Sequence, residues 1–254
     1  MQERRRIILQ EVESYGKVRV AELSKKLDCS EVTIRNDIKS MDEAGLLIRT
    51  HGGALKIEKT VERKYSAESI YRRVEQKKKI AAYAYEFIND RDTVIMDDAS
   101  NTFYLALHIK NHPEKRVIVV TNSLLIGNEL AGVSHVELYM VGGYVGGHLS
   151  ATLGEPAIKY IEQFRVDKAF IGVHGINFEV GLTSIAEPQR QVKQAIVKAA
   201  DKVYVFADSS KFGGGYLSVV CPLSNIHKII TDDEITDENI KKAQVYGVPL
   251  LVTK

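Results

Sequence analysis

The sequence is poor in cysteine and contains no long apolar run. No apolar stretch approaches the ~20 residues that a membrane-spanning helix needs, so insertion into a bilayer is not expected. Cys29 and Cys221 lie far apart and lack the spacing of metal ligands, which argues against a disulfide framework and against a zinc site. The N-terminus also lacks the charged-then-apolar order of a secretory signal. We therefore expect a cytoplasmic protein.

Positive charge is concentrated in the first third of the chain. Residues 1–80 carry a net charge of +6, whereas the remainder carries −4. This asymmetry favours a polyanionic partner for the N-terminal part, although a solvated basic face would give the same count. The length of 254 residues is enough for one large domain, or for a small and a medium one.

The first sixty residues have the pattern of three short helices followed by a β-hairpin. Apolar residues three and four apart predict helices over residues 3–15 and within residues 18–30. Ser30 is a good N-cap for a third helix over residues 31–45. Gly52 and Gly53 then form the turn between two short predicted strands. This order is typical of a winged helix-turn-helix, whose second motif helix enters the major groove of DNA.

Polar side chains on the third predicted helix and on the wing are the candidate contacts to double-stranded operator DNA. Arg35 suits guanine edges, Asn36 suits adenine, and Lys39 suits phosphates. The predicted DNA-binding residues are Ser30, Thr33, Arg35, Asn36, Lys39, Arg49, His51 and Gly52. The alternative is an ordinary small helical domain whose polar face is only hydrated.

The same segment carries a family resemblance. Residues 30–54, SEVTIRNDIKSMDEAGLLIRTHGGA, resemble the N-terminal signature of the DeoR family of bacterial transcriptional regulators, in which T-I-R-x-D-L and R-x-x-G-G-A recur. The resemblance implies a DNA-binding regulator, usually a repressor.

After residue 90, apolar strand-like runs alternate with helical patterns. Near-continuous Val/Ile strands linked by helices of about ten residues predict a mostly parallel, doubly wound α/β sheet covered on both faces. Residues 56–79 are highly charged and poor in large apolar side chains, which is typical of a connector. We predict a winged helix-turn-helix domain over residues 1–57, a linker over 58–76 and an α/β effector-binding domain over 77–254.

Six polar segments follow the predicted strands of this second domain. Ligands of open α/β sheets bind at the carboxyl ends of the strands, where helix N-termini offer free N–H groups. Each segment alone is explained by helix capping or a tight turn, but six at one edge favour a ligand pocket. They are residues 97–102, 121–123, 141–147, 172–175, 182–187 and 207–215. No segment matches a nucleotide-binding fingerprint, so no cofactor is expected. His108 and His112 are four apart, as metal ligands on one helical face can be, but no third ligand is evident nearby, so no metal is expected.

The family resemblance continues through VVTNSLLIGNEL, MVGG, DKAFIGV and ADSSKFG. It implies a domain similar in fold to ribose-5-phosphate isomerase, which senses a sugar phosphate or related metabolite. The predicted effector-binding residues are Asp97, Asp98, Ser100, Asn101, Thr102, Asn122, Gly142, Gly143, Thr183, Glu187 and Lys211.

Several positions depart from the family pattern. The family's first loop usually reads D-S-G-T-T, whereas here Asp98 adds a carboxylate and Ala99 replaces a glycine. His174 and Gln189 stand where relatives commonly carry acids, while Lys211 is retained. Because an added carboxylate repels phosphate, the effector is expected to be less anionic than a typical sugar phosphate, or to be held mainly by backbone N–H groups and Lys211.

Two functions are weighed. The first is a transcriptional regulator, expected to be a homo-oligomer (dimer or tetramer) because helix-turn-helix proteins usually read paired half-sites. The second is a sugar-phosphate isomerase that has gained a DNA-binding module, with Asp97, Asp98 and Lys211 as acid–base groups. An amide at Gln189 cannot take a proton, so regulation is favoured over catalysis.

Overall fold

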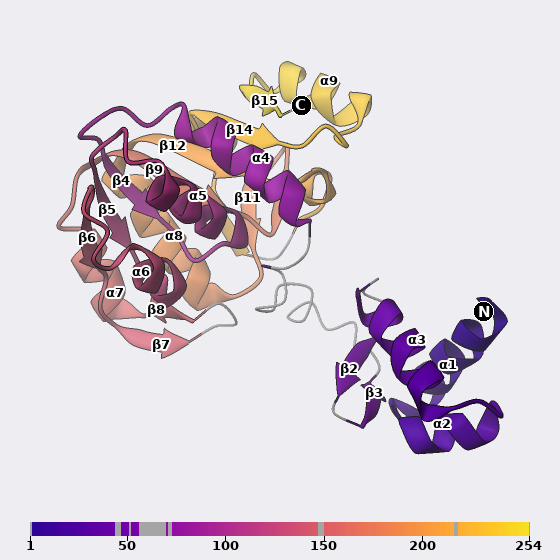
Figure 1. Ribbon diagram of the computed structural model, residues 1–254. Helices are drawn as coiled ribbons and strands as arrows, with labels where there is room; N and C mark the ends of the chain where they lie inside the picture. Colours follow the sequence, from indigo (N-terminus) through magenta and orange to yellow (C-terminus); the bar gives the residue numbers. More distant parts are fainter. Residues whose placement is uncertain are drawn as a thin grey trace. The chain divides into compact units, whose positions relative to one another are not determined.

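The computed structural model describes residues 2–43, 47–50, 52–55, 70, 73–146, 150–215 and 218–253. The chain divides into two compact units, Met1–Lys64 and Tyr65–Lys254 (Figure 1). Within the described residues, no helix is long and apolar enough to cross a membrane.

The N-terminal unit packs its helices against a small antiparallel sheet. Its elements are α1 (Gln2–Tyr15), β1 (Lys17–Arg19), α2 (Val20–Lys26), α3 (Glu31–Glu43), β2 (Ile48–Thr50) and β3 (Gly53–Leu55). The apolar residues at helical spacing form one buried cluster that includes Ile8, Val12, Leu23, Ile34, Ile38 and Met41. This arrangement confirms the predicted winged helix-turn-helix.

The sheet of this unit has a strand that the sequence pattern did not predict. Strand β1 pairs with β3, giving the order β1-β3-β2. The second helix is predicted within residues 18–30, and α2 begins there at Val20. The short strand before it is missed because its three residues are too few to show an alternating pattern. At Gly53 a Cβ atom would lie 1.9 Å from the Val18 carbonyl oxygen, so a glycine is required where β3 meets β1.

A buried carboxylate ties α1 to α3. Asp37 accepts hydrogen bonds from Arg4 Nε at 2.5 Å and from Arg5 Nε at 2.9 Å. Burial alone would raise the pKa of Asp37, but the two guanidinium groups outweigh burial and lower it. The basic start of the chain therefore serves partly to neutralise this carboxylate.

The second unit is built on a parallel sheet of order β15-β14-β12-β9-β4-β5-β6, which confirms the predicted α/β class. The sheet strands are β4 (Thr93–Met96), β5 (Val117–Thr121), β6 (Val136–Met140), β9 (Val166–Gly172), β12 (Ala200–Phe206), β14 (Lys228–Thr231) and β15 (Leu250–Val252). The helices are α4 (Val74–Tyr85), α5 (Ser100–Asn111), α6 (Leu124–Leu130), α7 (Glu155–Ile161), α8 (Glu187–Ala199) and α9 (Asp237–Val245).

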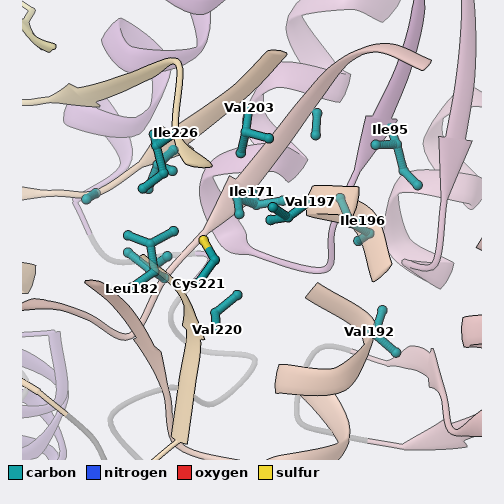
Figure 2. Close-up of a cluster of buried hydrophobic side chains, with 14 of the residues drawn as sticks. Ile95, Ile171, Leu182, Val192, Ile196, Val197, Val203, Val220, Cys221 and Ile226 are labelled. Atoms are coloured by element: carbon teal, nitrogen blue, oxygen red, sulfur yellow. The ribbon is translucent and has the colours of Figure 1, made fainter. Parts of the chain in front are cut away.

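The helices cover both faces of this sheet. Buried residues of α4, α5 and α6 pack on one face with Met96, Phe170 and Phe206 (Figure 1). Helices α7, α8 and α9 pack on the other face. Figure 2 shows part of this second core, where Ile95 and Ile171 of the sheet lie near side chains of α8.

Short antiparallel pieces lie outside the main sheet and were not predicted. They are the hairpin of β7 (Tyr144–Gly146) and β8 (Ala151–Leu153), and the sheet of β10 (Gly175–Asn177), β11 (Gly181–Ser184) and β13 (Ser218–Cys221). Residues 182–184 belong to one of the polar segments predicted to follow a strand, but they form most of β11. Short 3-10 turns, η3 (Ser209–Lys211) and η4 (Leu223–Asn225), complete the connections.

The order of the strands reverses between β4 and β9. From β4 the chain adds β5 and β6 on one side, then returns to place β9 on the other side of β4. A crevice forms outside the carboxyl ends of the strands at such a switch point, because the connections on its two sides lead away over opposite faces.

We predict that Gly53→Ala destabilises the N-terminal unit by about 1–3 kcal/mol, because the new methyl group forces β3 away from the Val18 carbonyl. Differential scanning calorimetry of the full chain measures this as a lowered transition temperature. Gly52→Ala is the matched control, since a Cβ there meets no atom within 4 Å. Equal effects of the two substitutions would contradict the account of the β1–β3 contact.

Candidate nucleic-acid interface and ligand site

Helix α3 presents the predicted DNA-contacting side chains on its outer face. Ile34 and Ile38 are buried, whereas Arg35, Asn36 and Lys39 are exposed. Ser30 precedes the helix, and its Oγ accepts a hydrogen bond from the Thr33 amide at 3.2 Å. Ser30 Oγ also lies 2.9 Å from Thr33 Oγ1, so both hydroxyls are engaged at the helix start. The cap and the apolar stripe together fix which face of α3 is exposed to solvent.

Of the predicted DNA-binding residues on the wing, the structure describes Arg49 and Gly52. Arg49 on β2 is exposed, and its backbone N–H donates to Asp42 Oδ1 at 3.0 Å. Gly52 is exposed at the turn, and its carbonyl accepts from the Val20 amide at 2.9 Å. His51 lies outside the described residues. On α3, Arg35 forms an ion pair of 2.7 Å with Glu31, an exposed contact that is easily exchanged for a phosphate or a base.

In the second unit, the carboxyl ends of β4 and β9 meet at Asp97. The Asp97 carboxylate is fully buried and accepts hydrogen bonds from the Gly172 amide at 2.9 Å, the Ala99 amide at 3.0 Å and Thr102 Oγ1 at 3.0 Å. A Cβ at Gly172 would lie 2.3 Å from the Ala99 methyl group, so Ala99 fits only because residue 172 is glycine. Asp97 therefore holds the loop after β4 against the end of β9.

Lys193 completes this arrangement from α8. Its buried ammonium group donates to Asp97 Oδ2 and, at 2.9 Å, to the Gly172 carbonyl. Burial alone would lower the pKa of Lys193, but the carboxylates of Asp97 and Asp98 outweigh burial and raise it. Sequence reasoning missed Lys193, although a signal existed. It lies on the apolar face of α8, between Val192 and Ile196, where a lysine needs a buried partner.

Asp98 shares this environment but lies farther from the ammonium group of Lys193 than Asp97 does. Its Oδ1 lies 3.9 Å from Lys193 Nζ, and its Oδ2 accepts a hydrogen bond of 3.3 Å from Gln189 Nε2. Burial raises the pKa of Asp98; Lys193 opposes this rise, and the neighbouring Asp97 carboxylate adds to it. Gln189 thus serves as a hydrogen-bond donor to the Asp98 carboxylate.

His174 lies at the end of β9 beside two lysines. Burial, together with the positive charges of Lys193 and Lys211, lowers the pKa of His174 to about 3. The imidazole is therefore neutral at pH 7. Its Nδ1 lies 3.3 Å from Ser184 Oγ on β11. The predicted residue Lys211 is thus close enough to His174 for its charge to affect the pKa of that imidazole.

The other predicted effector residues lie on several different elements of the second unit. Thr183 is buried in β11, and its hydroxyl donates to the Gly175 carbonyl at 3.0 Å. Glu187 is exposed and accepts from Arg190 Nε at 2.6 Å, so it is not drawn into the Asp97 cluster. Gly142 and Gly143 follow β6, two strands away from β4, and are exposed. Ser100 is half-buried at the start of α5.

The remaining two predicted residues, Asn101 and Asn122, are buried at the ends of neighbouring strands. Asn101 lies in the first turn of α5 after β4, and Asn122 directly follows β5. The Oδ1 atom of each has no hydrogen-bond partner among the described residues.

A second charged cluster lies at the carboxyl ends of β12 and β14. Arg73, which precedes α4 in the left-handed region at φ 51°, donates to Asp232 Oδ2 at 3.3 Å and pairs with Glu234. Its Nη1 also lies 3.6 Å from Asp208 Oδ1. A non-glycine residue in this conformation is held by its contacts, here three carboxylates from two strand ends.

Comparisons with known proteins agree with this architecture. Residues 4–60 match the family model of the DeoR-like helix-turn-helix domain, and residues 72–233 match that of the DeoR C terminal sensor domain. The chain is 30% identical to an uncharacterized HTH-type transcriptional regulator FruR of Bacillus subtilis (strain 168), over 97% of each chain. It is also 30% identical to a putative aga operon transcriptional repressor of Escherichia coli O157:H7, over 98% of this chain and 93% of that protein.

Among solved structures, a ribose 5-phosphate isomerase from Methanocaldococcus jannaschii aligns with 58% of this chain and 55% of its own. The TM-score is 0.40 and the sequence identity 16%.

We predict that Lys193→Met destabilises the second unit by about 3–5 kcal/mol, because it leaves two buried carboxylates without their cation. Urea unfolding followed by circular dichroism measures the loss. Lys198→Met, an exposed lysine on the same helix, is the matched control and is expected to stay within about 0.5 kcal/mol of the parent chain. Adding Asp97→Asn to Lys193→Met should recover part of the loss. An unchanged unfolding midpoint for Lys193→Met would refute the pairing.

Proposed function

The chain belongs to the DeoR family of transcriptional regulators, and from this premise we propose that it represses genes of carbohydrate catabolism until a metabolite binds its sensor domain. It is a DNA-binding transcriptional regulator. The observation that carries the DNA-binding role is the exposed polar face of the capped helix α3, opposite its buried apolar stripe.

In this proposal α3 reads the major groove. Arg35 contacts a guanine edge, Asn36 an adenine edge, and Lys39 a phosphate, while Arg49 and the wing hold the backbone. The protein acts as a symmetric homo-oligomer, because one short helix reads only a half-site and a two-fold axis doubles the contacts. It works in the cytoplasm, where bacterial operator DNA lies.

The effector site proposed is the crevice between β4 and β9, flanked by Asp98, His174 and Lys211. The domain boundaries proposed are residues 1–57, 58–76 and 77–254. A sensor is favoured over an isomerase because Asp97, the carboxylate at the centre, already accepts from Lys193, Thr102 and two backbone amides. A general base must be able to take a proton from the substrate, and a carboxylate held this way is poorly suited to do so.

Arg73 is proposed to couple the effector site to the DNA-binding domain. It lies near the end of the proposed linker and joins it to Asp232 and Glu234. Its Nη1 also donates to Ser209 Oγ at 3.3 Å, at the start of the turn that carries Lys211. A ligand that moves this turn changes the position of Arg73, and an effector acts only through such a difference between two states.

For DNA binding, we predict that Arg35→Ala weakens binding to the chain's own upstream DNA by about 10–100-fold, the equivalent of one lost base contact. A gel-shift titration at fixed salt measures the change. Lys39→Ala should weaken binding to all sequences alike and reduce the salt slope by about one. Lys159→Ala, an exposed lysine of the second unit, is the control. If Arg35→Ala binds like the parent chain, the proposed orientation of α3 fails.

For coupling, we predict that Arg73→Gln lowers the induction ratio of a reporter driven by the chain's upstream DNA. The reporter is compared across single carbon sources, so the effector need not be identified, and immunoblots confirm equal protein levels. Lys78→Gln, an exposed residue one turn into the same helix that pairs with Glu75, is the matched control. An induction ratio for Arg73→Gln equal to that of the parent chain on every source rejects the coupling role.

A further inference from the structure

Two buried side-chain oxygens at neighbouring strand ends have no hydrogen-bond partner among the described residues. They are Asn101 Oδ1, after β4, and Asn122 Oδ1, after β5. Both side chains are more than nine-tenths buried, with 6% and 1% exposure. The parallel register places Met96 beside Thr121, so the residues that follow these two positions leave the sheet side by side. The third such atom, Thr231 Oγ1, lies at the end of β14, three strands away from β4.

The orientation of the Asn122 side-chain amide is fixed by the hydrogen bond of its nitrogen atom. Its Nδ2 group donates to the Thr152 carbonyl at 3.1 Å, so the amide cannot be reversed without placing two acceptors together. The unpaired atom is therefore an acceptor. Leaving a buried acceptor unsatisfied costs about 1–3 kcal/mol, and native proteins seldom keep one without a reason.

Asp98, three residues before Asn101 in the segment that follows β4, is a third buried acceptor. Gln189 occupies one of its oxygens, and Lys193 lies 3.9 Å from the other, beyond hydrogen-bond length. A carboxylate accepts several hydrogen bonds, so Asp98 retains capacity. Asp98, Asn101 and Asn122 are called the acceptor corner below.

Cations near the acceptor corner do not favour an anion there. Lys193 is already engaged by Asp97 and by the Gly172 carbonyl. The imidazole of His174 is neutral at pH 7 because burial disfavours its charged form. A phosphate group placed at the corner would face the Asp97 and Asp98 carboxylates, which already share the Lys193 ammonium. Lys211 belongs to the turn after β12, two strands away from β4.

We propose that the acceptor corner binds neighbouring hydroxyl groups of a sugar or polyol, and that it excludes phosphate. Each hydroxyl donates its hydrogen to one of the three acceptors, which satisfies the two orphaned amide oxygens. This inference rests on the proposed sensor function and specifies which part of the ligand the corner recognises. Asp98, the residue added to the family's loop, sets the preference for donors.

The test uses a panel of four- to six-carbon polyols and aldoses, with the monophosphate of each, against the purified full chain. Thermal shift identifies binders and calorimetric titration measures their affinity at constant ionic strength. We expect Asn101→Leu to weaken the best binder by about tenfold or more, the loss of a buried hydrogen bond. The melting temperature of the ligand-free chain should be unchanged or raised, because the substitution removes an unsatisfied oxygen. Inorganic phosphate should not compete with the best binder.

The control is Asn128→Leu, an exposed asparagine of α6, which should leave the affinity unchanged. Asp98→Ser should allow inorganic phosphate to bind where the parent chain does not.

Any of four results overturns the inference: no member of the panel binds, inorganic phosphate competes in the parent chain, Asn101→Leu binds as tightly as the parent, or Asn101→Leu melts several degrees lower without ligand. A lower melting temperature of ligand-free Asn101→Leu would mean that Asn101 only stabilises the fold or binds a buried water molecule. Failure of the proposed function is seen separately, as absence of binding to the upstream DNA by the parent chain.

Discussion

The sensor unit depends on one buried interaction, the pair of Lys193 and Asp97. A buried ion pair contributes little net stability, because both charges lose their hydration. The role of this ion pair is to hold neighbouring segments of the chain in position. Asp97 gathers the amides of Ala99 and Gly172, while Lys193 adds the Gly172 carbonyl and brings α8 to the same point. One carboxylate and one ammonium thus fix the ends of β4 and β9 and the helix beside them, where the strand order reverses.

This pair also determines the electrostatics of the crevice. Burial raises the pKa of Asp98, and Lys193, which also pairs with Asp97, opposes this rise only in part. Because Lys193 lies closer to Asp97, the Asp98 carboxylate keeps acceptor capacity. The buried neutral imidazole of His174 adds no compensating charge. In the proposed site, the Asp98 carboxylate therefore favours hydrogen-bond donors, while Lys211, at the turn after β12, adds a positive charge.

The sequence was sufficient for the architecture and for part of the site. Alternating runs predicted the parallel sheet, and the spacing of Ile34 and Ile38 predicted the outer face of α3, because both depend on periodicity within one element. Strand β1 was missed because three residues show too little alternation. The position of Lys193 on the apolar face of α8 signals that it needs a buried partner. The partner itself lies 96 residues away along the chain, and a local pattern does not identify it. The unsatisfied oxygens of Asn101 and Asn122 depend on their surroundings in the folded chain, so no sequence pattern predicts them.

The proposed coupling becomes physically reasonable when α5 is considered as a single rigid element. Its first turn carries Asn101 and Thr102, which belong to the loop held by Asp97. One turn later, Tyr104 donates its hydroxyl to the Ile70 carbonyl at 2.9 Å, three residues before Arg73. Ile70 is itself buried in the core formed with α4 and α5. Close-packed interiors transmit small displacements instead of absorbing them, so in the proposed coupling a ligand that shifts the start of α5 also shifts the end of the proposed linker. This connection through α5 would act together with the ion pairs that Arg73 forms with residues following β12 and β14.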